Sequence, residues 1–270
     1  MSKTISAAAN PAMANKLVEK AVQEESLPML EPEILPPLDT MVELPGGYIT
    51  ATGEVIRRAE VRELNGKDEE AISRASNMGK ALVTILNRCV VKVGDTPATE
   101  DVLDNLLAGD RDMLLLAILK VTFGSTPKVV TYCGGCQEPK EVLVDINSDI
   151  KVKVLANPVD DRVFSLKGKA GEFIVQIPTG KVQKDLINNP DKTGAELTTS
   201  LLRGTLLSIN GTPVYSDAQV QNLSISDRRL IVDELNKRLP GPQFEVLKTV
   251  CPDCESEVSV PVTLDSLFRL

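Results

Sequence analysis

Two Cys-x-x-Cys pairs set the strongest constraint on how this chain of 270 residues can fold. Cys133 and Cys136 form the first pair, and Cys251 and Cys254 form the second. Each pair separates two runs of alternating apolar and polar residues, which predicts a β-hairpin with the cysteines at its tip. Four thiolates in two closely spaced pairs are typical of a site for one structural Zn²⁺ ion. Because about 114 residues lie between the pairs, the fold has to explain how both reach one ion.

The residues before each cysteine pair follow the same order in both halves of the chain. An expected β-hairpin is followed by a Gly-Lys pair, an amphipathic helix, a Thr-Pro turn, an Asp-Arg pair and then the cysteines. The matched stretches are 65–67 with 179–181, 79–88 with 194–203, 94–97 with 210–213, and 109–111 with 226–228. The offset rises from about 114 to about 118 residues, as a few one-residue insertions would produce. We therefore predict an internal duplication in which the same hairpin tip occurs once in each repeat.

The predicted fold is α+β, with two repeats that each hold a β-hairpin, helices and a Cys-x-x-Cys β-hairpin. We expect the first repeat to span residues 45–150 and the second to span residues 151–270. In the first repeat, acidic residues that suit a helix N-terminus predict one long helix from about Lys67 to about Cys89. A zinc-ribbon-like site shared by the two hairpin tips would join the repeats, with the metal near the axis that relates them.

An extended N-terminal arm is expected over residues 1–44, where the composition differs from the rest of the chain. Prolines interleaved with apolar residues over 27–38 favour extended chain rather than helix or interior strand. Residues 15–22 fit a short helix. Two interpretations stay open for this region: a disordered tail, or an arm that becomes ordered on a partner protein.

The composition argues against several classes of function. The chain has no histidine, which removes histidine-based nucleophile activation, histidine metal ligands and the common pH switch. A net charge of -8 argues against a general nucleic-acid binder, which needs a basic face. No apolar run approaches bilayer length and no signal-peptide pattern opens the chain, so we expect a soluble protein of a reducing compartment, without membrane contact. In such a compartment Cys-x-x-Cys pairs bind metal more often than they form disulfides.

Three interpretations of the paired cysteines remain open: a shared four-cysteine zinc site, disulfides within or between the pairs, and a dithiol redox site. A redox Cys-x-x-Cys normally opens a helix that lowers one thiol pKa, whereas both motifs here lie between strand-like runs. A zinc site with Cys133, Cys136, Cys251 and Cys254 as ligands would be structural, because four protein sulfurs leave no open position for water or substrate. The pairs are expected to meet either in one chain or between the chains of a domain-swapped dimer. The remaining cysteine, Cys89, is predicted to be a small buried apolar residue.

Other motifs carry less functional weight. We interpret the repeated pairs Asp110-Arg111 and Asp227-Arg228 as the acidic first turn of a buried helix, with an arginine that bonds nearby carbonyls or acids. Residues 178–181 resemble a phosphate loop only superficially, because they lack its glycine and lysine spacing. No set of carboxylates has a spacing that implies catalysis or Ca²⁺ binding. We therefore expect neither an enzyme nor a small-molecule substrate.

Three short stretches stand out beside the cysteine pairs. They are Val-Glu-Leu-Pro-Gly-Gly at 42–47, Ala-Glu-Val-Arg-Glu-Leu-Asn-Gly-Lys-Asp-Glu-Glu at 59–70, and Gly-Asp-Arg-Asp at 109–112. Together with the cysteines they resemble the baseplate hub subunit and assembly-chaperone family of T-even-like contractile-tailed phages, over roughly residues 42–265. The resemblance implies a role in building or forming the tail baseplate, without enzymatic activity.

Four functional hypotheses follow. The first is a structural baseplate component of the virion, assembled in the host cytoplasm, whose N-terminal arm reaches across a neighbouring tail or baseplate protein. The second is a transient assembly chaperone that is absent from the finished particle. The third is a thiol-disulfide enzyme that uses Cys133 and Cys136. The fourth, a zinc-ribbon nucleic-acid binder, fits poorly with the acidic charge and the scarcity of aromatic residues.

Overall fold

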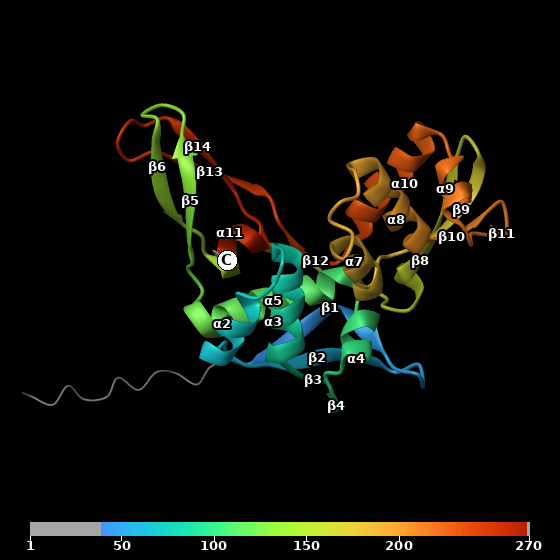
Figure 1. Cartoon of the computed structure of the whole chain (residues 1–270), viewed down its shortest axis with the longest axis horizontal. Coiled ribbons are helices and arrows are strands. Elements are labelled where there is room, and N and C mark those ends of the chain that lie inside the picture. Colours follow the sequence, from blue (N-terminus) through green and yellow to red (C-terminus); the bar gives the residue numbers. More distant parts are fainter. Residues whose placement is uncertain (1–38, 269–270) are drawn as a thin grey trace, which may run out of the picture. The chain divides into compact units, whose positions relative to one another are not determined.

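The structure is a computed structural model that describes residues 39–268 (Figure 1). Helices and strands are mixed along the chain, which confirms the predicted α and β content. The expected helix at 15–22 and the Pro-rich stretch at 27–38 lie outside the described residues. The first strand begins at Met41, so the last residues assigned to the arm, up to Leu44, belong to a sheet.

The first half of the described chain is built on a four-stranded antiparallel sheet of order β1-β2-β3-β4. Its strands are β1 (Met41–Ile49), β2 (Val55–Val61), β3 (Val90–Val93) and β4 (Thr96–Pro97). The helices that follow or interrupt them are α2 (Gly66–Ile72), α3 (Met78–Cys89), α4 (Glu100–Asn105) and α5 (Ala108–Phe123). After α5 come the hairpin strands and two short elements: β5 (Lys128–Cys133), β6 (Glu138–Leu143), α6 (Ile146–Asp149) and β7 (Lys151–Lys153).

The second half follows a similar order of elements. Its sheet has the order β8-β9-β10-β11, with β8 (Val163–Gly168), β9 (Gly171–Gln176), β10 (Leu206–Ile209) and β11 (Thr212–Pro213). A short 3-10 turn precedes the sheet, and four helices accompany it: η2 (Asp160–Arg162), α7 (Gly180–Ile187), α8 (Gly194–Thr205), α9 (Asp217–Gln221) and α10 (Ile225–Arg238). The chain ends with β12 (Gly241–Gln243), β13 (Val246–Val250), β14 (Glu257–Pro261) and α11 (Leu264–Phe268).

The two sheets share an irregularity as well as an order. Between β2 and β3 the register shifts by one residue, which leaves Val91 as the extra residue of a β-bulge. Between β9 and β10 the corresponding shift leaves Leu207 as the extra residue. Both side chains are exposed, at 45% and 39%. A bulge bends its strand and increases the local twist. The two sheets are therefore bent at equivalent strands, β3 and β10.

The prediction of one long helix from Lys67 to Cys89 is wrong, because the helix is interrupted between α2 and α3. The Ser73 hydroxyl donates to the carbonyl of Glu69, and the Asn77 side chain accepts the N–H of Lys80 as the N-cap of α3. Serine and asparagine side chains offer the backbone hydrogen bonds that compete with a continuous helix. The break turns α3 back against α2.

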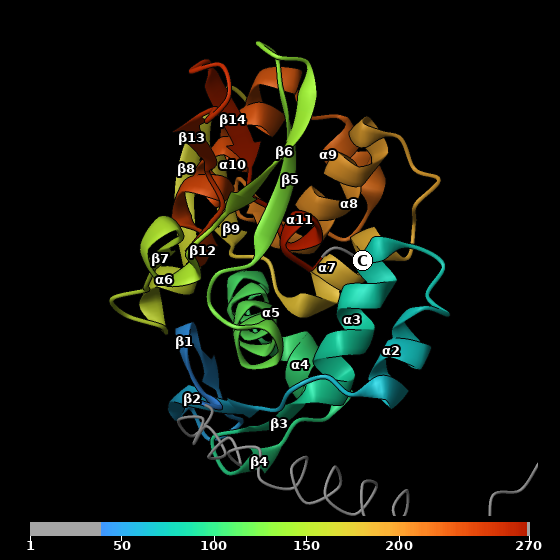
Figure 2. The ribbon, with the colours of Figure 1, turned by 90° about the vertical axis from the view of Figure 1, so that its left-hand side faces the viewer.

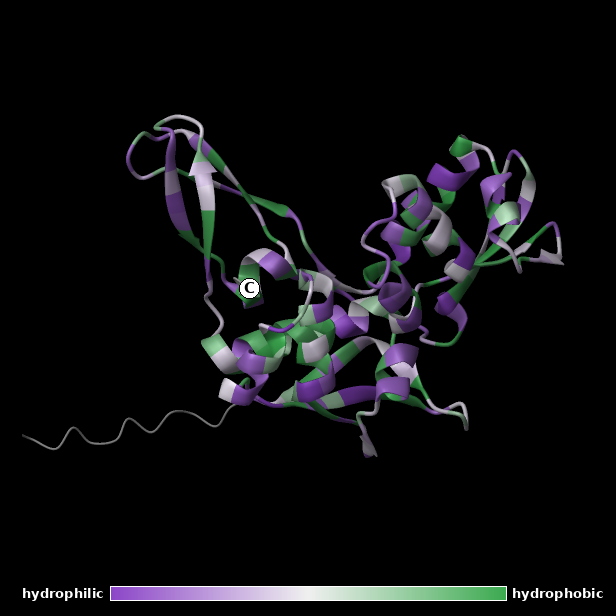
Figure 3. Cartoon of the chain, in the orientation of Figure 1, coloured by the Kyte–Doolittle hydropathy of each residue, from purple (hydrophilic) through white to green (hydrophobic). Residues whose placement is uncertain are grey.

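Two hydrophobic cores stabilise the described chain. The first lies between the sheet β1–β4, α3 and α5, and the second lies between the sheet β8–β11, α8 and α10. Helix α5 is apolar around most of its circumference, as the green ribbon in Figure 3 shows. A helix that is apolar on all sides is expected to be covered on all sides. Helix α5 is contacted by β1 and β2 of the sheet, by α3 and α7, and by β12 and α11 from later in the chain.

The chain crosses between its halves in two adjacent strands. Strand β7 leads out of the first half and β12 leads back, and the two pair in antiparallel fashion. Beside them, the start of α5 lies against the backbone that enters β12. A Cβ atom added to Gly109 would lie 1.7 Å from the carbonyl oxygen of Pro240, so only glycine fits there. This close crossing directs the rest of the chain back toward the first half.

The C-terminal segment, residues 244–268, packs on the first core although it follows the second half in sequence. Val260, Val262, Leu267 and Phe268 are buried in the first core, and α11 contacts both α5 and β5. The hairpin β13–β14 lies beside the hairpin β5–β6 (Figure 2). By packing, this segment belongs with the first half, although in sequence it follows the second.

Candidate metal centre

The four paired cysteines lie at the tips of the two neighbouring hairpins. Cys133 ends β5 and Cys136 follows in the turn, while Cys251 follows β13 and Cys254 lies in the next turn. Both turns are closed in the same way. The N–H of Gln137 donates to the carbonyl of Cys133, and the N–H of Glu255 donates to that of Cys251, each at 3.0 Å.

The residue after each pair adopts the same unusual backbone conformation. Gln137 has a φ of 58° and Glu255 has a φ of 57°, both in the left-handed region that non-glycine residues rarely adopt. Such a residue reverses the chain immediately after the second cysteine. The two tips therefore have matching shapes, and each can present two sulfurs to one point.

The sulfur atoms of the two tips meet in a single chain. The Sγ atoms of Cys133 and Cys254 are 3.5 Å apart, those of Cys136 and Cys251 are 3.9 Å apart, and all four lie within 4.8 Å of one another. A tetrahedral zinc ion with bonds of about 2.3 Å places its sulfurs about 3.8 Å apart. A disulfide bond is only about 2.05 Å long. The spacing fits metal ligands, and all five cysteines of the chain are free thiols.

The surroundings of two of the thiols shift their pKa values in opposite directions. The hydroxyl and the backbone N–H of Ser256 donate to Cys254 and lower the pKa of its thiol to about 6. Burial, together with hydrogen bonds to the other thiols, raises the pKa of Cys136 to about 11. A metal ion binds thiolates, so it has to displace the proton of Cys136. We expect metal binding at this site to strengthen as pH rises.

Contacts between the hairpins bring the tips together. The Thr131 hydroxyl donates to the carbonyl of Ser259 at 3.0 Å. The Lys140 ammonium lies 2.5 Å from a carboxylate oxygen of Asp253 on the other tip. Gly135 is so close to the second tip that an added Cβ atom would lie 2.2 Å from the Ser256 hydroxyl. Sequence reasoning did not find these residues, because each contact joins positions more than a hundred residues apart.

The arrangement favours a structural metal over redox chemistry. Four sulfurs this close together suit Zn²⁺ or an iron–sulfur centre, and as ligands of one tetrahedral ion they would leave no open position for a substrate. Neither cysteine pair stands at the start of a helix, where a reactive dithiol is normally found. Val258 and the buried Cys133 and Cys251 form a small apolar cluster around the site.

The repeated Asp-Arg pairs have the structural role that the sequence indicated. Asp110 accepts the N–H of Gly46 at 2.6 Å, and Asp227 accepts the N–H of Lys169 at 2.7 Å. Each arginine donates to the carbonyl eight residues before it: Arg111 to Leu103 at 3.1 Å, and Arg228 to Val220 at 3.3 Å. Each pair thus bonds the start of a helix to backbone groups of neighbouring segments.

Two further sequence candidates are also structural. Cys89 is fully buried, as predicted, and burial raises the pKa of its thiol to about 11. The superficial phosphate loop leads into α7, where an added Cβ atom on Gly180 would lie 2.3 Å from the Arg111 guanidinium. That space is filled by a side chain, so it offers no cradle for a phosphate.

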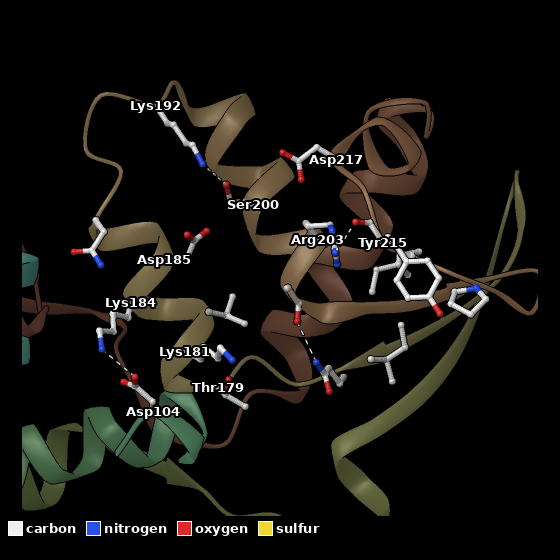
Figure 4. A pocket seen from close by; sticks show the side chains of 18 residues that line it. Asp104, Thr179, Lys181, Lys184, Asp185, Lys192, Ser200, Arg203, Tyr215 and Asp217 are labelled. Carbon is white, nitrogen blue, oxygen red and sulfur yellow. Dashed lines mark hydrogen bonds and ion pairs between the residues drawn. The ribbon is translucent and has the colours of Figure 1, made fainter. Parts of the chain in front are cut away.

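A groove of about 1050 Å³ is lined mainly by the second half, by α7, α8, β10 and residues 213–217, with Asp104 of α4 at its edge (Figure 4). It carries both signs of charge. Arg203 donates to the carbonyl of Tyr215 at 2.7 Å and Lys192 donates to Ser200 at 2.8 Å, while Asp185 points into the groove. None of the paired cysteines lines it. The groove and the sulfur cluster are therefore separate features.

Comparison with known proteins places the chain in a family. Residues 50–202, more than half of the chain, match the family model described as T4 bacteriophage base plate protein. The chain belongs to this family. The match covers the first cysteine pair and ends before the second. Neither a curated protein nor a solved structure gives a significant match. Within residues 39–268, no helix has the length and apolar character needed to cross a membrane.

Proposed function

We propose that this base plate family member is a non-enzymatic structural component of the phage tail baseplate hub, present in the virion and stabilised by one zinc ion. Family membership supports the baseplate role. The observation that carries the zinc assignment is the meeting of four free thiols, all within 4.8 Å, at two matching hairpin tips. Cys133, Cys136, Cys251 and Cys254 are the proposed ligands.

The zinc ion would join the C-terminal segment to the first half. Its ligands come from two hairpins that lie side by side, although one closes the first half and the other follows the second half in sequence. Because a preformed site is absent from an unfolded chain, the free energy of metal binding adds to the free energy of folding. The centre would therefore act as a clasp and not as a catalyst.

We infer that the two halves derive from one duplicated unit. The similar order of elements, the matching bulges and the matching arginine–carbonyl bonds support this origin. The two hairpin tips would then be copies of one structure, each contributing half of a metal site. This explains why two cysteine pairs so distant in sequence share a single ion.

The partners of the protein are proposed to be other tail and baseplate proteins, reached partly through residues 1–38. That stretch holds apolar residues between prolines, a composition that suits binding in extended form. Deletion of residues 1–38 is expected to leave a folded protein that supports tail assembly poorly. Electron microscopy of particles made with the deleted protein would show this, and normal tails would refute the arm's role.

Metal analysis tests the zinc centre directly. We expect about one zinc ion per chain after purification without chelator, and loss of that zinc in Cys251→Ser. A protein without metal but with a titratable dithiol would instead support the redox hypothesis. Measurement of the solution mass alongside the zinc content distinguishes a site within one chain from a site between chains.

The role in the virion is tested by mass spectrometry of purified particles. Stoichiometric presence of the chain would support a structural baseplate component assembled in the host cytoplasm and retained in the tail. Absence from finished particles, combined with failed baseplate assembly when the chain is removed, would instead identify a transient assembly chaperone.

A further inference from the structure

An ion pair bridges the two hairpin tips beside the cysteine cluster. Lys140 lies on β6 of the first hairpin, and its side chain is 14% exposed. Its ammonium contacts Asp253 on the second tip at 2.5 Å and Glu138 on its own hairpin at 2.8 Å. Asp253 stands between the two cysteines of its tip and Lys140 is four residues after Cys136, so the pair joins the two tips close to the proposed ligands. Hydrogen bonds to both carboxylates raise the pKa of Lys140, which keeps the side chain cationic.

The two tips differ at the positions that this pair occupies. Lys140 is the fourth residue after the second cysteine of its tip, and the matching residue in the other hairpin is Val258. Asp253 directly precedes its second cysteine, and the matching residue is Gly135. Val258 is buried and Gly135 packs directly against Ser256 and Cys254. The charged pair therefore has no counterpart at the matching positions, which hold an apolar residue and a glycine.

We propose that the Lys140–Asp253 pair positions the two tips at metal-binding distance and so raises the affinity of the site for zinc. This inference rests on the zinc centre proposed above. Metal binding is stronger when the ligands are already held in place, because less conformational freedom is lost on binding. Groups that orient metal ligands without touching the metal commonly change affinity by about 10- to 100-fold. Because Asp253 is 60% exposed, a smaller effect is expected here.

An alternative action of Lys140 makes the opposite prediction for Asp253. If the lysine charge acted directly on the thiolates, removal of Asp253 would free that charge and leave zinc affinity unchanged or higher. If the pair instead acts as a clamp that holds the two tips together, removal of either side chain weakens zinc binding. Removal of both then weakens it no further. The two side chains therefore have to be tested separately and together.

The experiment measures zinc affinity of the full-length protein by competition with a chromogenic chelator. We expect Lys140→Gln and Asp253→Asn each to lower the affinity about fivefold, and the double variant to match the single variants. The difference from wild type should shrink in concentrated salt, which screens exposed charges. Lys248→Gln is the matched control, because Lys248 pairs with Glu257 at 2.8 Å within the second hairpin alone. Its zinc affinity should equal that of the wild type.

Each remaining outcome counts against the clamp. Unchanged or higher affinity in Asp253→Asn would overturn it and leave the zinc centre intact. Additive losses in the double variant would show that the two side chains act independently, which also overturns it. A wild-type protein that binds no zinc would refute the proposed centre itself, and the clamp with it.

Discussion

At Gly135, the close approach of the two cysteine tips depends on the side chain being a single hydrogen atom. An added Cβ atom would lie 2.2 Å from the Ser256 hydroxyl and 2.9 Å from the sulfur of Cys254. Gly135→Ala is expected to push the tips apart, lowering zinc affinity and destabilising the protein by about 1–3 kcal/mol. Zinc competition and thermal unfolding measure both effects. Gly134→Ala is the control, because an added Cβ atom there has no neighbour within 4 Å; equal behaviour of the two variants would contradict the geometry.

Asp110 should make the stability of the first half depend on pH. Its side chain is fully buried, one of its oxygens has no hydrogen-bond partner, and burial raises its pKa to about 6 although Arg162 lies nearby. A carboxyl whose pKa is raised in the folded state stabilises the protein when protonated, and that stabilisation is lost as pH rises through about 6. From pH 8 to pH 5 the gain from this group is about 1 kcal/mol.

The contribution of Asp110 is isolated by comparison with Asp110→Asn. Urea unfolding at pH 8 and at pH 5 gives the free energy difference between the two proteins. That difference should shift in favour of the wild type at pH 5, because the asparagine does not titrate. A difference that stays constant with pH would show that Asp110 does not change its protonation in this range.

At the scale of elements, the break between α2 and α3 is organised by one buried carboxylate. Asp68 in the first turn of α2 accepts from Arg62, directly after β2, and from Arg88 near the end of α3, each at 2.6 Å. Hydrogen bonds from Arg62 hold the pKa of Asp68 well below its usual range, so its stabilisation is present above about pH 4 and is lost as pH falls further.

Asp68→Ala is expected to destabilise the protein by about 3 kcal/mol, because it leaves two arginines without their buried partner. Denaturant unfolding at neutral pH measures this cost. Glu70→Ala on the same helix is the control, since its pair with Arg74 is solvent-exposed and worth little. A cost below about 1 kcal/mol for Asp68→Ala would mean that the network does not hold α2 against α3.

The sequence was informative about elements wherever a pattern repeats. Hairpins and most helices follow from apolar periodicity, and the cysteine site follows from the spacing of two equal tips. The break at Ser73–Asn77 was missed because acids and apolar residues on either side continue a helical pattern across it. The contact between Lys140 and Asp253 could not be predicted, because it joins residues 113 positions apart and has no charged equivalent in the other pair of positions.

For the whole molecule, sequence patterns show which face of an element is buried but not which core buries it. The alternation at residues 257–261 predicts a hairpin strand with one apolar face. Nothing in that alternation indicates that Val260 packs in the first core and not in the second. The close crossing at Gly109 and Pro240 brings the chain back past the first half before this strand begins. That contact is seen only in the three-dimensional structure.

The packing of the C-terminal segment gives a prediction for the whole chain. Phe268 is 5% exposed and lies in the first core. Phe268→Ala is expected to destabilise the first half by about 3 kcal/mol, since it removes a large buried side chain. Hydrogen exchange should rise in α5 and stay unchanged in α10, which belongs to the second core. Faster exchange in α10 than in α5 would contradict the assignment of this segment to the first half.

The return of the chain end to the first core also sets an order for protein synthesis. The nascent chain emerges from the ribosome N-terminus first, and domains generally fold as units in that order. Here the second half holds all the strands and helices of its own core before β13 is made, while the first core lacks α11 until residues 264–268 have been translated. A ribosome that stops before Val260 would therefore release a finished second half joined to an unfinished first half.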